Sequence, residues 1–219
     1  KYDLIMDEET TLIDTKTRNE SFKSFFIKNK KLLISLSIFL ILILFSFYTY
    51  SIYKDGHREW LANKYNKAVI EYENGEKLKV ISSMKEVIKD KNTTYSPLAL
   101  YFLLDNNLIE NKDMVNRLFD ILIQDTNLER EIKNLVIYKK GLFNSNKINE
   151  SELMEILKPI INSQSIWKSH TLYLLAEYFY SKKEKEKSKE FFKEIISLEN
   201  SNMNIKAEAQ KRINRDFGE

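Results

Sequence analysis

The pattern of hydrophobic and polar positions separates an uncharged run, Leu32 to Tyr53, from a longer part in which apolar residues recur every three or four positions. As a helix this run would extend about 33 Å, which matches the roughly 30 Å hydrocarbon core of a bilayer. A buried helix of a soluble protein seldom reaches this length without a charge. A cleaved signal peptide has a shorter apolar stretch, followed by small residues at its cleavage site. This run is longer, and no such small residues follow it. The run therefore predicts a permanent transmembrane helix at residues 32–53.

The residues on either side of the run predict its orientation. Basic residues precede it closely, at Lys28, Lys30 and Lys31, whereas the segment after it has a weaker excess of positive charge. Because basic segments tend to stay on the cytoplasmic side of a membrane, residues 1–31 are expected to form a short cytoplasmic tail. Residues 54–219 would then lie outside the cytoplasm.

Beyond the run, the apolar spacing predicts amphipathic helices rather than strands. They are expected at residues 58–74, 77–90, 97–108, 112–124, 128–143, 150–162 and 203–216, with two more after residue 166. The clearest apolar stripes lie in those two helices, and their members are Trp167, Leu172, Leu175, Ala176 and Phe179, then Ser188, Phe191, Phe192, Ile195 and Leu198.

Short polar links between these helices predict antiparallel hairpins. The first helices of successive pairs begin roughly 32 to 39 residues apart, near the period of about 34 residues that is typical of tetratricopeptide repeats. Such hairpins bury their apolar faces only by stacking on one another. The predicted fold class is therefore all-α: the transmembrane helix, then a tetratricopeptide-like solenoid of about four pairs at 54–219, closed by a capping helix.

Local signals predict where some helices begin and end. Ser96 is expected as the N-cap of the second pair, with Pro97 at the first helical position. Asn149 or Ser151 is expected to cap the second helix of the third pair. Between the uncharged run and the first pair, Gly56 is the one residue that disfavours a helix. Its cost of about 1 kcal/mol is too small to end a long helix, so we expect a nearly continuous helix over residues 32–74.

The amino-acid composition limits the classes of fold and function that the chain can have. Four Gly and two Pro are few for a sheet protein or for a fold that needs glycine loops, and the absence of Cys excludes disulfides and thiolate metal sites. From Asp55 onward, 27 basic residues face 26 acidic ones. A balanced domain lacks the positive field that attracts nucleic acid, so we expect no nucleic-acid partner.

The sequence contains no recognisable catalytic or cofactor site. His57 and His170 are isolated from any set of metal ligands, and no phosphate-binding loop or nucleophile elbow is present. We therefore expect no metal, no cofactor, no small-molecule substrate and no enzymatic activity.

The first helices of tetratricopeptide pairs line a concave groove that commonly binds peptides. Polar and aromatic residues one stripe away from the packed face are the candidates for such a groove here. They are Tyr101, Asp105, Asn134, Tyr138, His170, Tyr173, Glu177 and Tyr180. An ordinary solvent-exposed helix face is the alternative interpretation.

The chain resembles the YfgM-like ancillary subunits of the bacterial SecYEG translocon. The resemblance lies in DEET ahead of FKSFFIKNKK and the span, in YNKAVIEYENGEKLKVISSMKEVI, and most specifically in SIWKSHTLYLLAEYFYSKKEKEKSKEFFKEII. Positions that are Ala-rich in the family carry Ser, Ile, Lys and Asn in this chain. The resemblance implies an inner-membrane anchor and a periplasmic repeat domain that binds the translocon and exported proteins or their chaperones.

Two classes of function follow. The first is a membrane-tethered scaffold of the export machinery, with translocon subunits, exported proteins or periplasmic chaperones as partners. The second is a coordinator of envelope assembly or cell division that acts through self-association, because one solenoid fold can serve both.

Overall fold

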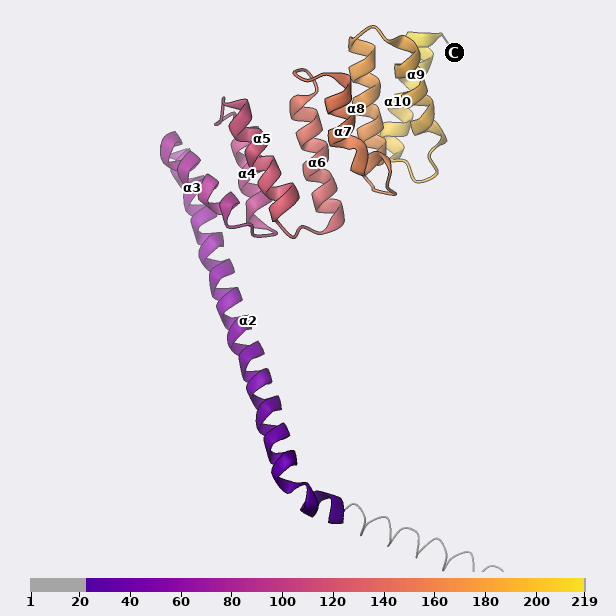
Figure 1. Cartoon of the computed structure of the whole chain (residues 1–219). Helices are drawn as coiled ribbons and strands as arrows, with labels where there is room; N and C mark the ends of the chain where they lie inside the picture. The colour runs from indigo at the N-terminus through magenta and orange to yellow at the C-terminus, as the bar shows by residue number, and fades with distance from the viewer. Residues whose placement is uncertain (1–22, 219) are drawn as a thin grey trace, which may run out of the picture. The chain divides into compact units, whose positions relative to one another are not determined.

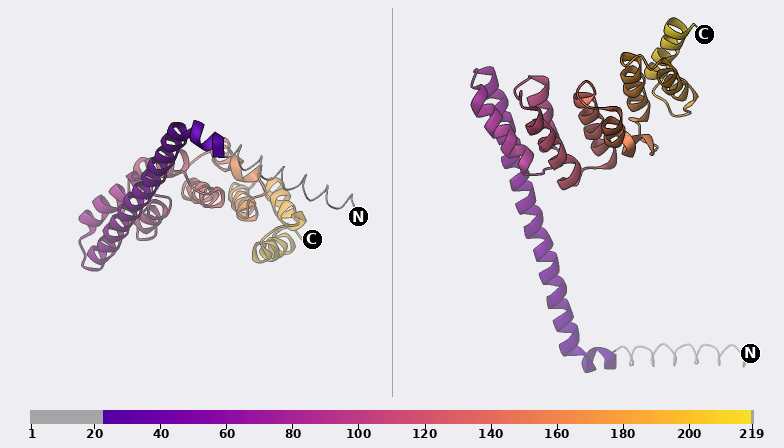
Figure 2. Two further views of the ribbon diagram at one scale, coloured as in Figure 1. Left: turned by 90° about the horizontal axis from the view of Figure 1, so that it is seen from below. Right: turned by 45° about the horizontal axis from the view of Figure 1, so that its top comes forward.

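The computed structural model describes residues 23–218, and every regular element in that range is a helix (Figure 1 and Figure 2). The predicted all-α class is thus confirmed across the described range. The chain divides into two compact units, Lys1–Glu59 and Trp60–Glu219. Most of the predicted cytoplasmic tail, residues 1–22, lies outside the described residues.

The first unit is built on α2 (Lys30–Glu73), a helix of 44 residues that continues into the second unit. The apolar window of α2 has a mean hydropathy of 2.5, and none of it is buried. Among the residues that the structure describes, α2 is the one helix long and apolar enough to cross a membrane. The predicted continuous helix is confirmed to within two residues at each end, and Gly56 lies inside it without interrupting it.

The other helices belong to the second unit, and where a range was predicted their ends agree with it to within four residues. They are α3 (Lys77–Lys89), α4 (Tyr95–Asp105), α5 (Lys112–Asp120), α6 (Arg130–Asn144), α7 (Glu150–Ile161), α8 (Lys168–Ser181), α9 (Lys185–Ser197) and α10 (Met203–Phe217). A π-helical turn, η1 (Ile121–Asp125), continues α5 where α-helix was predicted. Neighbours in sequence pack together, most closely α8 with α9, α9 with α10, and α3 with α4.

The same turn closes three helices, α2, α4 and α8. Gly75, Asn107 and Lys183 have positive φ angles of 84°, 51° and 67°. The N–H of each donates to the carbonyl three residues earlier, and the N–H of the next residue donates to the carbonyl five residues earlier, all at 2.9–3.0 Å. This is the Schellman motif, which satisfies carbonyls at a helix end. The chain therefore reverses direction in the same way at the tips of three hairpins.

The start of α4 differs from the prediction. The helix begins at Tyr95, so Ser96 is not the N-cap and Pro97 is the third helical residue. The Asn92 side-chain oxygen accepts a hydrogen bond from the Tyr95 N–H at 3.0 Å, which allows the helix to begin earlier. Pro is tolerated at the third position because an N–H in the first turn has no partner within the helix. The buried Ser96 hydroxyl instead donates to the Val87 carbonyl in α3 at 2.7 Å.

The start of α7 agrees with the prediction. The Asn149 side chain accepts from the Glu152 N–H at 3.0 Å, and the Glu152 carboxylate accepts from the Asn149 N–H at 3.2 Å. This reciprocal pair is a capping box. Asn149 is therefore the N-cap, and Ser151 lies within the helix.

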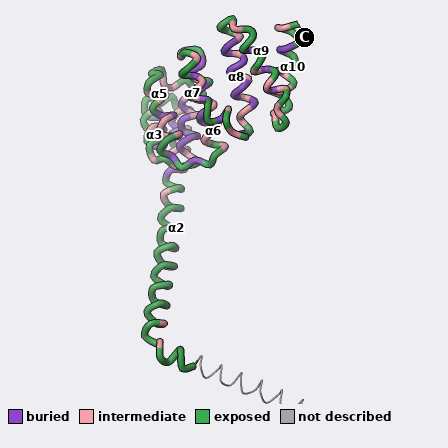
Figure 3. The backbone as a smooth tube through the Cα atoms, turned by 45° about the vertical axis from the view of Figure 1, so that its right-hand side comes forward, coloured by how far each residue is buried: buried purple, intermediate pink, exposed green. Residues whose placement is uncertain are grey.

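The buried residues of the second unit alternate with exposed ones along its helices (Figure 3). Its buried apolar side chains form three clusters. The first runs from α2 to α6, the second joins α7 to α8, and the third joins α8, α9 and α10. Phe192 is fully buried in the third, with its ring centre 5.5 Å from that of Tyr173, so its predicted place in the core is confirmed. Most of the two predicted stripes is also buried, namely Leu172, Leu175, Ala176, Phe179, Ser188 and Ile195.

Candidate binding surface

The last part of the loop that connects α7 to α8, residues 165–167, is tied to the first turn of α6. The Glu131 carboxylate accepts hydrogen bonds from the Ser165 hydroxyl at 2.6 Å and from the Ile166 N–H at 3.2 Å. The Trp167 indole N–H donates to the Glu131 carbonyl at 3.1 Å. The Ser165 hydrogen bond holds the pKa of the Glu131 carboxyl below its ordinary value. These three bonds give the loop, which we call the Trp167 loop, a defined position against α6.

The local sequence explains why Glu131 is available for this task. Glu129 is the N-cap of α6, and its side chain accepts from the N–H groups of Glu131 and Ile132 at 3.0 and 3.4 Å. Acidic residues are favoured in the first turn, where the N–H groups of a helix are unpaired. Glu131, whose carboxylate also pairs with Arg130 at 3.2 Å, therefore stands at the helix start within reach of the Trp167 loop.

Three aromatic rings gather here, one each from this loop, α6 and α8. The rings of Tyr138 and Trp167 are nearly parallel, 18° apart, with centres 6.0 Å apart. The His170 ring lies 5.2 Å from Trp167 and 6.1 Å from Tyr138. Burial lowers the pKa of His170, against an opposing contribution from the Ile166 carbonyl, and burial raises the pKa of Tyr138. All three rings are therefore uncharged near neutral pH.

Two exposed isoleucines stand beside the residues that hold this cluster in place. Ile166 is 64% exposed although Glu131 binds its backbone N–H, and Ile132, which follows Glu131 in sequence, is 41% exposed. An apolar side chain held outward by a fixed backbone loses little entropy when a partner covers it. We call Ile132, Tyr138, Ile166, Trp167 and His170 the aromatic surface.

The predicted groove residues of α4 lie near α6. The ammonium group of Lys139 is 4.6 Å from the ring centre of Tyr101. Burial, and after it the charge of Asp105, raises the pKa of the Tyr101 hydroxyl far above its ordinary value, and this hydroxyl has no hydrogen-bond partner within residues 23–218. Asp105 and Lys139 line a hollow of about 220 Å³ with an apolar wall that includes Leu142.

On α6, the structure separates the two predicted groove residues. Asn134 is buried, and its amide nitrogen has no hydrogen-bond partner in the part of the chain that the structure describes. Tyr138, one turn further along the helix, belongs to the aromatic surface.

The last three predicted residues all lie on α8, and two of them, Glu177 and Tyr180, are engaged by α10. The guanidinium of Arg212 pairs with the Glu177 carboxylate and lies 4.8 Å from the ring centre of Tyr180. The same guanidinium bonds Asp216 at 2.5 Å. Tyr173 contacts Phe192 within the third cluster. Seven of the eight predicted residues thus fall into three contact groups, with Asn134 apart from them, and their role in binding stays a prediction.

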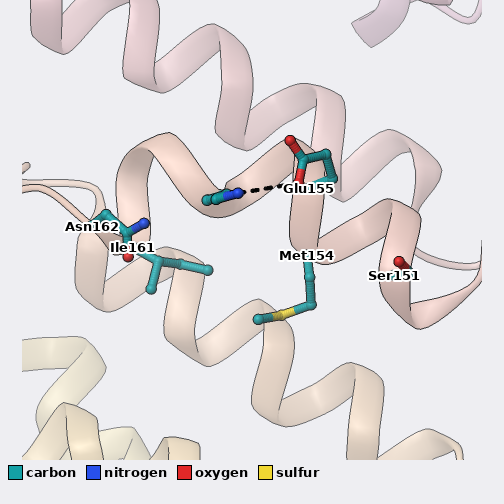
Figure 4. Close-up of a pocket in the computed structure, with 6 residues that line it drawn as sticks. Ser151, Met154, Glu155, Ile161 and Asn162 are labelled. Carbon is teal, nitrogen blue, oxygen red and sulfur yellow. Dashed lines mark ion pairs between the residues drawn. The ribbon is translucent and has the colours of Figure 1, made fainter.

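A further hollow, of about 320 Å³, follows one face of α7 (Figure 4). Met154 and Ile161 contribute its apolar side chains, and Glu155 forms an ion pair with Lys158 at 3.6 Å. Among residues 23–218 no group of three or more His, Cys, Asp or Glu side chains could hold a metal ion.

Sequence reasoning missed Glu131 and Ile166. One signal could have indicated Glu131: it precedes Ser165 by 34 residues, close to the predicted repeat period. Residues one period apart occupy equivalent places on neighbouring hairpins. Comparison with protein-family models, with curated proteins and with solved structures finds no match.

Proposed function

We propose that this protein is a single-pass, membrane-anchored scaffold of the bacterial inner membrane, whose helical region binds other proteins outside the cytoplasm. One observation carries this proposal. The uncharged run, Leu32 to Tyr53, has no buried residue, follows a group of lysines and continues without a break into the helical hairpins. A helix that is apolar on all sides and unburied within its own chain needs an apolar surrounding, which a bilayer supplies.

We further propose that the hairpins form a tetratricopeptide-like solenoid. Hydrogen bonds and ion pairs recur at separations near one repeat: 34 residues from Glu131 to Ser165, 33 from Ser169 to Asn202, and 35 from Glu177 to Arg212. The three identical Schellman turns support the same interpretation. Apart from Met203 and Ala207, the exposed residues of α10 are polar or charged, as a terminal capping helix requires.

Binding of proteins is the function that the candidate surface supports best. Trp and Tyr are enriched among the residues that contribute most to protein interfaces, and the aromatic surface holds both in fixed positions. Together with the resemblance to YfgM-like proteins, this favours an ancillary role at the Sec translocon, with translocon subunits, exported proteins or periplasmic chaperones as partners.

Photo-crosslinking in intact bacterial cells tests the proposal. A photoreactive amino acid at Ile166 of the full chain should crosslink to a translocon subunit, an exported protein or a chaperone. The same group at Asn204, an exposed residue on α10, is the matched control and should give fewer products.

Two results would contradict it. Crosslinks to a second copy of this chain alone would favour the coordinator that acts by self-association. Protection of the C-terminal region from protease in cells with an opened outer membrane would place that region in the cytoplasm and exclude a role in export.

A further inference from the structure

A short basic segment precedes the candidate span within the first unit. Residues 23–28 are helical, Asn29 forms a turn, and α2 begins at Lys30. Phe25, Phe26 and Ile27 are each more than half exposed. We call residues 23–29 the basic arm.

The basic arm leaves the axis of α2 at Asn29. The Asn29 side-chain amide donates to the Phe25 carbonyl at 3.0 Å, and the Asn29 backbone N–H donates to the same carbonyl at 2.9 Å. The arm bends away from the helix at this point (Figure 2). Because the uncharged run starts three residues later, at Leu32, the bend lies where a spanning helix would leave the hydrocarbon.

The charged residues of this region are all basic. Lys23, Lys28, Lys30 and Lys31 stand within nine residues, and no acidic residue occurs between Glu20 and Asp55. Lysines beside exposed aromatic residues are the pattern of segments that lie in the interface of a membrane, where the rings reach the acyl boundary and the ammonium groups reach the headgroups. Each lysine near an anionic surface contributes about a fivefold preference for it.

We propose that the basic arm lies along the membrane surface and binds anionic phospholipid headgroups beside the N-terminal end of the span. This inference rests on the membrane anchor of the proposed function. The bend at Asn29 directs the arm along the bilayer, and Phe25, Phe26 and Ile27 enter the interface between the charged headgroups. The arm thereby selects anionic lipids around the anchor.

Spin labels on the full chain in lipid nanodiscs test this inference, because the chain has no Cys and a single introduced Cys is labelled uniquely. With the label at Phe26→Cys, and again at Ile27→Cys, we expect access to oxygen in discs that contain phosphatidylglycerol. In discs of phosphatidylcholine alone, we expect access to a water-soluble nickel chelate. The double substitution Lys23→Gln and Lys28→Gln should lower the equilibrium constant for binding of the labelled arm to the membrane surface about thirtyfold.

The controls separate the arm from the anchor. A label at Ile38→Cys, inside the span, should be inaccessible to the chelate in both lipids, and its access to the chelate would overturn the anchor itself. Replacing two distant lysines, Lys77→Gln with Lys133→Gln, should leave the arm immersed. If the Ile38 label is buried while the arm labels stay in water in both lipids, or are immersed equally in both, the proposed binding of anionic headgroups is wrong.

Discussion

At the scale of single residues, Gly141 permits a close crossing of α6 and α7. A Cβ at this position would lie 2.5 Å from a methyl carbon of Leu157. Gly141→Ala should therefore lower the free energy of unfolding by about 1–3 kcal/mol, the usual cost of overpacking. Urea unfolding of the full chain in detergent, followed by circular dichroism, measures it. Gly56→Ala is the control, because no atom lies within 4 Å of its added Cβ. Equal stability of Gly141→Ala and the wild type would contradict the close crossing.

Asp216 gives a prediction for pH at the same scale. Hydrogen bonds from Arg215, and after it from Arg212, hold the pKa of the Asp216 carboxyl well below its ordinary value, although burial opposes them. The pKa of this carboxyl is lower in the folded chain than in the unfolded chain, where it is about 4, so the ionised carboxylate stabilises the fold at pH values above about 4. This stabilisation is lost as the pH falls from about 4 through the pKa of the folded chain.

Hydrogen exchange of α10 below pH 4 checks this prediction. In the wild type, protection of α10 should fall with pH, whereas Asp216→Asn should start lower and depend less on pH. Glu208→Gln is the control, since its ion pair with Lys211, at 3.3 Å, is exposed. A wild-type profile no steeper than that of Asp216→Asn would show that the carboxyl is not linked to folding.

At the scale of helices, the three core clusters predict that damage stays local. Phe192 is fully buried in the third cluster, so Phe192→Ala should cost about 3–5 kcal/mol. In hydrogen exchange, α9 and α10 should lose protection before α3 does, because helices contact mainly their neighbours in sequence. Met84→Ala, in the first cluster, should show the reverse order. Uniform loosening in both variants would mean that the hairpins unfold as one unit.

At the scale of the whole molecule, two exposed leucines should behave differently. Leu42 is 61% exposed at the middle of the uncharged run, and Leu78 is 85% exposed on α3. Arg at the centre of a spanning helix costs about 2.5–3.5 kcal/mol. Leu42→Arg should therefore reduce the fraction of protein molecules that stay in the membrane when it is extracted with alkaline carbonate. Leu78→Arg should leave this fraction unchanged. Equal fractions for the two variants would mean that the run is not in lipid.

How far the sequence predicts the site can be seen at Trp167 and Arg212. The sequence predicted Trp167 in the packed stripe of this helix, whereas it precedes α8 as its N-cap and is only half-buried. Its indole bond to Glu131 joins residues 36 positions apart. The neighbouring polar stripe on α8 predicted Glu177 and Tyr180 as groove residues. In the structure, Arg212 of α10 contacts both of their side chains. No local pattern encodes either pairing, because each depends on how the hairpins stack.

The sequence by itself determined the all-α class, the limits of most helices, the candidate span and the unbroken passage through Gly56. Helical spacing, length and charge are properties of one contiguous segment, so they can be read without knowing what the segment packs against. Only the tertiary structure decided that Ser96 bonds Val87 rather than capping α4, and that Glu131 positions Ile166. These contacts join separate helices and loops, and only the packing of those helices brings their atoms within hydrogen-bonding distance.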